Sequence, residues 1–180
     1  MANYGVLTKG IHLPGSGDAC ALEAWSEYIG VPRTDDPVTL RTWDIRPFDE
    51  MPWMTNEART GALVELTAAM AGSRDWTSAR ILRFLELVQT RIRKEVFPIL
   101  DIRPKMADAY ARFHADAYGS DHADARAMSS ALGYTRAVAD IRTRDHRPSD
   151  TLLVLLCRIW AEAAVNSARS PDESGVGKCL

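Results

Sequence analysis

Apolar residues recur at three- and four-residue steps along most of the chain, the spacing that places them on one face of an α-helix. Over residues 77–97 this pattern is carried by Ile81, Leu82, Leu85, Val88, Ile92 and Val96. Over residues 55–71 it is carried by Leu63, Leu66 and Met70. The strict alternation of apolar and polar residues that is typical of strands is nearly absent. The pattern therefore predicts an all-α fold.

Capping and helix-breaking residues mark where these helices begin and end. Thr55 or Asn56 is the expected N-cap of the first of these helices and Thr77 of the second, since all three have suitable side chains. Gly72 is expected to close the first of these helices, and Pro98 to end or kink the second. Two more helices are expected between residues 104 and 142, a stretch rich in alanine.

The last predicted helix runs from Ser149 or Asp150 to about Ala168. In its first half the apolar residues occupy all sides: Leu152, Leu153, Val154, Leu155, Leu156, Ile159 and Trp160. A helix that is apolar all round is usually buried. We therefore expect this helix to lie at the centre of the fold.

A shorter helix is predicted near the N-terminus, over about residues 19–29. Asp18 is its expected cap, and Gly30 and Pro32 are expected to end it. Its apolar stripe consists of Leu22, Trp25 and Ile29. We expect this stripe to face the core.

These elements predict a single helical domain of five or six helices over residues 1–168. Residues 1–17 are expected to form an extended arm, and residues 169–180 a mobile tail. The segment 30–54 contains four prolines, which exclude long helices, and five large apolar residues. These are Trp43, Phe48, Met51, Trp53 and Met54. We expect this irregular segment to pack onto the helices, because disordered segments lack such anchors.

Composition narrows the function classes. The 180 residues are 46% hydrophobic and 26% charged, with a formal net charge of −2. Such a chain lacks the basic surface that binds nucleic acid, and its apolar runs are too short to span a membrane. The three cysteines show no close pairing and no targeting segment is evident. We therefore expect a cytoplasmic protein that binds neither nucleic acid nor membrane.

The candidate chemistry lies at Cys20. This residue follows a Gly-Ser-Gly turn at the start of the first predicted helix, where the helix dipole favours a thiolate. On a helical wheel Cys20 points roughly 140° away from the apolar stripe, towards Glu23 and Glu27. We therefore expect Cys20 on a polar edge of the helix.

Three interpretations of Cys20 remain open. It is a nucleophile if a base such as His12 reaches it, although the neighbouring carboxylates oppose ionisation of the thiol. It is a zinc or iron ligand if it shares a metal with His12, Glu23 and Asp36. Otherwise it is a structural cysteine that caps the helix, and no cofactor is expected.

The residues around Cys20 carry a family resemblance. The stretch from His12 through Gly17-Asp18-Ala19-Cys20-Ala21-Leu22-Glu23-Ala24 is followed by Asp35-Asp36-Pro37. It resembles a group of uncharacterised small helical proteins of actinobacteria and their phages, with the motif H…G-x-C-x-[ML]-E-A…D-[HD]-P. The resemblance covers about residues 12–37, and Asp36 stands where the pattern has His. It implies that Cys20 and Glu23 belong together, and it supplies no substrate.

Two functions follow from these observations. The first is a small accessory protein without catalytic activity, which binds a protein partner or associates with itself and is linked to phages or mobile elements. The alternative is a small enzyme that uses Cys20 as a nucleophile, or as a metal ligand with His12 and Glu23. The alanine-rich helices and the lack of a complete catalytic set in the sequence favour the accessory protein.

Overall fold

The computed structural model describes residues 7–8, 18–100, 109, 112, 131–133, 135 and 149–168. The helices in this part of the chain are α1 (Ala21–Tyr28), α2 (Arg46–Asp49), α3 (Asn56–Met70), α4 (Ser78–Arg91), α5 (Phe97–Leu100) and α8 (Asp150–Ser167). A 3₁₀ turn (Ser73–Asp75) precedes α4, and a π-helical turn (Ile92–Val96) joins α4 to α5. The described residues include no strand, so the all-α prediction is confirmed.

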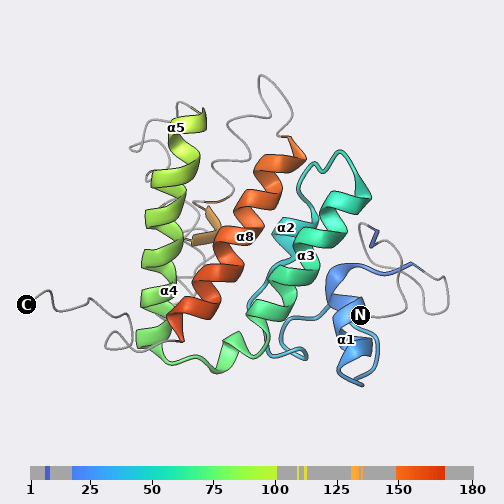
Figure 1. Ribbon diagram of the computed structural model, residues 1–180. Helices are drawn as coiled ribbons and strands as arrows, with labels where there is room; N and C mark the ends of the chain where they lie inside the picture. The colour runs from blue at the N-terminus through green and yellow to red at the C-terminus, as the bar shows by residue number, and fades with distance from the viewer. Residues whose placement is uncertain are drawn as a thin grey trace, which may run out of the picture.

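Three helices, α3, α8 and α4, lie side by side with α8 in the middle (Figure 1). The carboxylate of Asp150, at the start of α8, accepts hydrogen bonds from the backbone N–H groups of Met54 (2.7 Å) and Thr55 (3.0 Å). This joins the starts of α8 and α3, so the two helices run parallel. Arg80, near the start of α4, donates to the carbonyl of Ala164 near the end of α8 (3.2 Å). Helix α4 therefore runs antiparallel to its neighbours.

Helix α8 is the buried centre that its sequence predicts. Its buried residues include Leu152, Leu153, Leu156, Cys157, Ile159, Trp160, Ala161, Ala163 and Ala164. Only a narrow strip of this helix is open to solvent, and it includes Thr151, Arg158, Glu162 and Val165. Ser149 caps the helix by accepting from the N–H of Leu152.

A chain of aromatic rings links the elements around α8. The ring of Trp160 lies edge-on to Phe48 of α2 (centroids 4.9 Å apart) and to Phe84 of α4 (5.2 Å). Phe84 in turn meets Trp76 at 5.5 Å. The guanidinium of Arg80 covers the outer face of this chain, 4.0 Å from the Trp76 ring centroid. Edge-to-face pairs of this kind add to the hydrophobic stabilisation of a core.

The boundaries predicted for α3 and for the start of α4 are confirmed. Thr55 caps α3 by accepting from the N–H of Ala58, and Thr77 caps α4 by accepting from the N–H of Arg80. Gly72 follows α3 with a φ of 67°, a left-handed conformation that glycine adopts without strain. The predicted inward residues Leu63, Leu66 and Met70 are all fully buried.

One residue of α4 differs from the prediction, and at Pro98 one of the two predicted outcomes, the end of the helix, is excluded. Leu82 is 58% exposed, because the buried stripe of α4 passes through Ile81, Phe84 and Val88 instead. Pro98 does not end the helix. The π turn before it lets the N–H of Phe97 bond to the carbonyl of Ile92, five residues back. This wider turn accommodates a proline, which has no N–H to donate and crowds the preceding turn.

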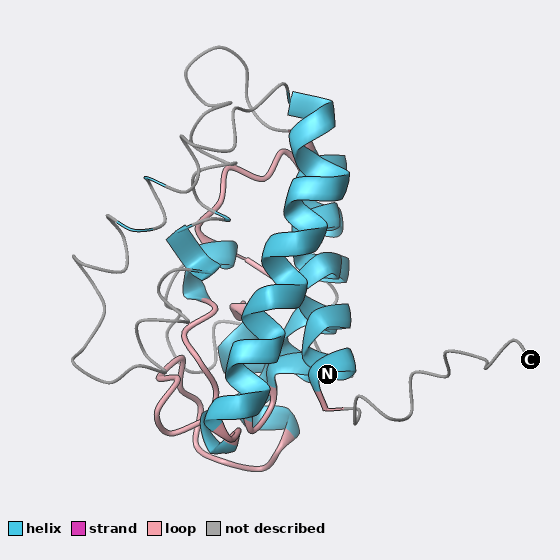
Figure 2. Ribbon diagram, turned by 90° about the vertical axis from the view of Figure 1, so that its left-hand side faces the viewer, coloured by secondary structure: helices cyan, strands magenta, loops and turns pink. Residues whose placement is uncertain are grey.

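The segment 30–54 packs onto the helix layer, as expected. Leu40, Ile45, Phe48 and Met51 are buried there. Helix α2 and the loops on either side of it lie to one side of the layer in Figure 2. The segment is not wholly irregular, since it contains α2, and Met54 is exposed rather than an anchor.

Of the expected N-terminal arm, the structure describes Leu7 and Thr8. Leu7 is buried, and its N–H donates to the hydroxyl of Thr60 on α3 (2.8 Å). The N–H of Thr8 donates to the carbonyl of Ala19 (2.9 Å). The rest of the arm, most of the alanine-rich stretch with the two helices expected over 104–142, and the tail 169–180 lie outside the described residues.

Candidate functional site

Cys20 is the N-cap of α1, the position for which the sequence had suggested Asp18. The capping is reciprocal. The backbone N–H of Glu23 donates to the sulfur of Cys20, and the backbone N–H of Cys20 donates to Oε2 of Glu23 (2.8 Å). This is a capping box in which cysteine replaces the usual serine or threonine. The spacing of Cys20 and Glu23 therefore has a structural cause at the helix end.

The predicted orientation of α1 is wrong. Cys20 is 5% exposed, not on a polar edge, whereas Ile29 of the expected inward stripe is 43% exposed and Trp25 is half-buried. The buried residues of the helix are Ala21, Leu22, Glu23, Ala24 and Ser26. Helix α1 turns its small and polar residues inward, and of the expected stripe only Leu22 is buried.

Hydrogen bonds explain how polar residues occupy the inner face of α1. The hydroxyl of Ser26 donates to the carbonyl of Glu23 (2.7 Å) and accepts from the N–H of Thr34 (3.1 Å). Arg33 returns over the helix, with its guanidinium 3.4 Å from the Glu23 carboxylate and bonded to the carbonyl of Asp18. Buried polar groups are tolerated when they are paired in this way.

A second buried ion pair lies close to Cys20. Arg59 of α3, only 2% exposed, places its Nε 3.3 Å from Oδ1 of Asp49 in α2. Burial raises the pKa of Cys20 to about 12; the charges of Glu23 and Asp49 add to this, while the hydrogen bond from the Glu23 N–H opposes it. The thiol is therefore protonated at neutral pH. A protonated, enclosed thiol is a poor nucleophile and a poor metal ligand.

The other predicted site residues do not join Cys20 in the part of the chain described. Asp36 caps the following turn, where it accepts from the N–H of Val38 and from the N–H and hydroxyl of Thr39. These hydrogen bonds hold the pKa of Asp36 below its usual value. His12 lies outside the described residues. Among those described, no three His, Cys, Asp or Glu side chains are grouped as metal ligands would be.

The reversed orientation of α1 leaves an apolar surface in solvent, which we call the α1 outer face: Trp25, Tyr28 and Ile29. The rings of Trp25 and Tyr28 contact each other with centroids 5.3 Å apart and planes tilted by 30°, and Tyr28 is 63% exposed. The nearest exposed carboxylate in sequence is that of Glu27, and the nearest cation is Arg33, whose side chain is 11% exposed and reaches back to Glu23 and Glu27. Trp25 and Ile29 were expected to face the core, and Tyr28 was not singled out, so this surface was not predicted from the sequence.

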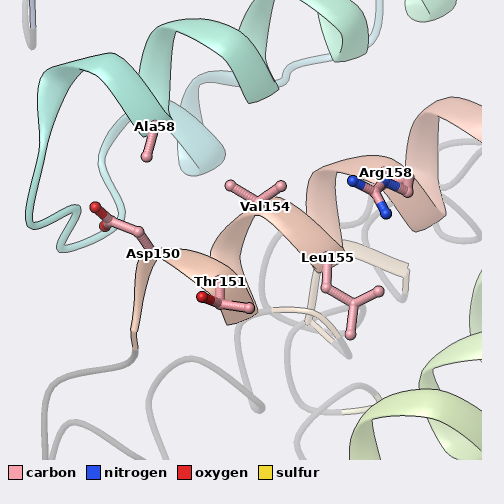
Figure 3. Close-up of a pocket in the computed structure, with 6 residues that line it drawn as sticks. All are labelled: Ala58, Asp150, Thr151, Val154, Leu155 and Arg158. Carbon is pink, nitrogen blue, oxygen red and sulfur yellow. The ribbon is translucent and has the colours of Figure 1, made fainter.

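A groove runs between α3 and α8. One hollow of about 400 Å³ lies over the starts of the two helices and is lined by Ala58, Asp150, Thr151, Val154, Leu155 and Arg158 (Figure 3). In that view Asp150 and Arg158 stand at opposite ends, with Val154 between them. The floor is therefore apolar and the two ends carry opposite charges.

A second hollow, of about 590 Å³, continues the groove towards the ends of the same helices. It is lined by Glu65, Ala68, Ala69, Ala161, Glu162, Val165 and Asn166. The lining residues include a run at steps of three, four or seven on each helix, so the two hollows lie along one stripe of each helix. These runs are Ala58, Glu65 and Ala69 on α3, and Thr151, Val154, Arg158, Ala161 and Val165 on α8. The two hollows thus follow one another along the same side of the two helices, which we call the α3–α8 groove. Arg158 and Glu162 in this groove are each two residues from Trp160, which is about 200° around the helix. They therefore point away from the Trp160 side of α8.

Comparison with known protein families, curated proteins and solved structures finds no match. None of the helices formed by the described residues is long and apolar enough to cross a membrane. What the chain does must therefore be argued from its own surfaces: the buried Cys20 corner, the α1 outer face and the α3–α8 groove.

Proposed function

We propose that this chain is a cytoplasmic accessory protein that acts by binding a segment of another protein on the α1 outer face, without catalysis at Cys20. The observation that carries the proposal is the exposure of Tyr28 and Ile29 beside the half-buried Trp25, on a helix whose polar side is buried. The resemblance of residues 12–37 to proteins of actinobacteria and their phages supports a role linked to mobile elements.

The packing of α1 supports a docking role for this face. Aromatic side chains supply most of the binding energy at protein interfaces, and they do so with few rotatable bonds. The outer face offers two contacting rings beside one aliphatic residue on a short, capped helix. Such a surface is already rigid, so binding on it orders few groups.

The surrounding charge indicates the chemistry of the bound segment. Glu27 is exposed beside Tyr28, and Asp18 is exposed at the other end of α1. The nearby cation, Arg33, has its guanidinium turned towards Glu23, Glu27 and the Asp18 carbonyl. An acidic border around an apolar centre fits a segment that carries apolar side chains beside lysine or arginine.

A displayed library of random peptides tests this proposal. The wild-type protein is the bait, and a Trp25→Ser, Tyr28→Ser, Ile29→Ser triple variant is the counter-bait. We expect enriched peptides that combine apolar and basic residues. Binding of a synthesised peptide, followed by calorimetry, should weaken at least tenfold for the triple variant.

Two control variants separate this proposal from its alternatives. Leu82→Ser removes an exposed apolar residue of α4 and should leave peptide binding unchanged. Cys20→Ser should also bind, provided that it remains folded, because the thiol does not reach the outer face. Peptides that bind the triple variant as well as the wild type, or that lose affinity with Leu82→Ser, would exclude the α1 outer face.

A further inference from the structure

We propose that the α3–α8 groove is the interface of an antiparallel homodimer, in which α8 of each copy lies in the groove of the other. The proposal rests on three features of the described residues: the spacing of the exposed strip on α8, the small side chains of α3, and the arrangement of charge along the groove.

The exposed strip of α8 has the spacing of a helix–helix seam. It consists of Thr151, Leu155, Arg158, Glu162 and Val165. The steps between these residues alternate between four and three, the heptad spacing with which one helix keeps contact with another along its length. Val165 is 51% exposed and Leu155 is half-buried, so both ends of the strip offer apolar contact.

The opposite wall of the groove lets a helix approach closely. Helix α3 lines the groove with Ala58, Ala68 and Ala69, interrupted by Glu65. Small residues allow two helix surfaces to approach at short interaxial distances, so the groove can accept a helix.

The charges identify the occupant as a second copy in antiparallel orientation. Arg158 lines the hollow at the helix starts together with Asp150, whose carboxylate already accepts from the N–H groups of Met54 and Thr55. Glu65 and Glu162 line the hollow at the helix ends. A two-fold axis across the groove brings the first hollow of one copy over the second hollow of the other. Arg158 then faces Glu65 of the second copy, and the contact occurs twice. A parallel arrangement would set Arg158 against Arg158.

Arg158 and Glu65 are available for this contact. Both are exposed, and neither forms an ion pair with the other described residues. Glu162 differs, because its carboxylate already binds Arg91 of α4 at 2.5 Å. The charge complementarity of the dimer therefore rests mainly on Arg158 and Glu65, which are the residues to test.

Charge reversal tests both the interface and its direction. We expect the wild-type protein to sediment as a species of twice the 20.0 kDa chain mass, in equilibrium with monomer. Arg158→Glu and Glu65→Arg should each raise the dimer dissociation constant at least tenfold, because two-fold symmetry places like charges together twice. The double variant should return it to within about threefold of the wild-type value.

Two further variants control the interpretation. Glu86→Arg reverses an exposed charge on α4, outside the groove, and should leave the dimer unchanged. Ala68→Trp fills the groove with a large side chain at an exposed position, and should give a monomer without altering any charge. Far-ultraviolet circular dichroism and the urea midpoint confirm that each variant is folded.

The outcomes are distinct from those of the peptide experiment. A wild-type protein that is monomeric at all concentrations overturns the proposal, as does a dimer that survives Ala68→Trp. A dimer weakened by both single reversals but not restored by the double variant excludes the antiparallel register. The α1 triple variant should dimerise normally, so failure of the proposed function leaves this test intact.

Discussion

Helix α8 buries its large apolar residues, whereas helix α1 exposes large apolar residues and buries small and polar ones. In α8 the large apolar residues lie inside, with Trp160 at the centre of the aromatic chain, and the exposed strip is mainly polar. In α1 the large apolar residues Tyr28 and Ile29 are exposed, while Cys20 and Glu23 are buried. The difference shows that hydrogen bonding rather than apolar area determines the packing of α1.

The size of each helix explains this difference. Helix α8 has 18 residues and lies between α3 and α4, so apolar side chains meet protein on almost every side. Helix α1 has eight residues, and among the described helices it makes extensive contact with α3 only. A short helix depends strongly on its caps, and the Cys20–Glu23 box fixes which side faces inward.

The largest expected effect is at the centre of the layer. Trp160→Ala removes the ring that touches both Phe48 and Phe84, and leaves the hydroxyl of Thr135 without its indole donor. We expect a loss of about 3–5 kcal/mol in the free energy of unfolding, measured in urea. Leu82→Ala, at an exposed site, should change it by less than about 0.5 kcal/mol. Comparable losses for the two variants would contradict the central position of α8.

A smaller effect is expected at the inner face of α1. Glu23→Ala removes one half of the capping box and leaves the guanidinium of Arg33 without this carboxylate. We expect a loss of about 2–3 kcal/mol in urea unfolding. Glu23→Gln keeps an acceptor for the Cys20 N–H and should lose roughly half as much. If Glu23→Ala were neutral, the capping box would not determine the orientation of α1.

The pH dependence of stability probes the same corner. Burial raises the pKa of Cys20 from the ordinary thiol value of 9.0 to about 12, so the unfolded chain loses the thiol proton first as the pH rises. The contribution of the protonated Cys20 thiol to the free energy of unfolding is therefore complete below pH 9 and falls as the pH rises above it. Between pH 8 and 10 the wild type should lose about 1.4 kcal/mol more than Cys20→Ala. Burial also raises the pKa of Cys157, which affects both proteins equally. Equal losses in the two proteins would show that Cys20 ionises freely in the folded state.

The smallest effect on stability is expected at the α1 outer face. Tyr28→Ser and Ile29→Ser each remove apolar surface that is already in solvent. The free energy of unfolding should change by less than about 0.5 kcal/mol for each. The urea midpoints, compared with that of Leu22→Ser on the inner face, check this. If the two outer-face variants were as unstable as Leu22→Ser, Tyr28 and Ile29 would belong to the core.

Most of the helical framework could be predicted from the sequence. The apolar steps in α3, the caps at Thr55, Thr77 and Ser149, and the apolar start of α8 each indicate a local structure, and the structure has it. The π turn before Pro98 could not be anticipated. A long helix can accommodate the missing N–H of a proline in several ways, and the π turn is one of them.

The candidate site was harder to predict. The pairing of Cys20 with Glu23 followed from their spacing, but their burial did not. On a helical wheel the inner face is chosen by the polarity of the residues on each side. This choice takes no account of a distant partner such as Arg33, which folds back onto Glu23. The α3–α8 groove involves residues almost a hundred positions apart, so no local pattern marks it. The exposed four-three steps of α8 were a usable signal, hidden by the apolar residues around them.

Hydroxyl-radical footprinting of the native protein, read by mass spectrometry, tests the orientation of α1 most directly, since it reports on both sides of the helix at once. We expect rapid oxidation of Tyr28 together with protection of Cys20 until the protein is unfolded in urea. Rapid oxidation of Cys20 with protection of Tyr28 would contradict the account, because α1 would then bury its apolar stripe and expose the thiol.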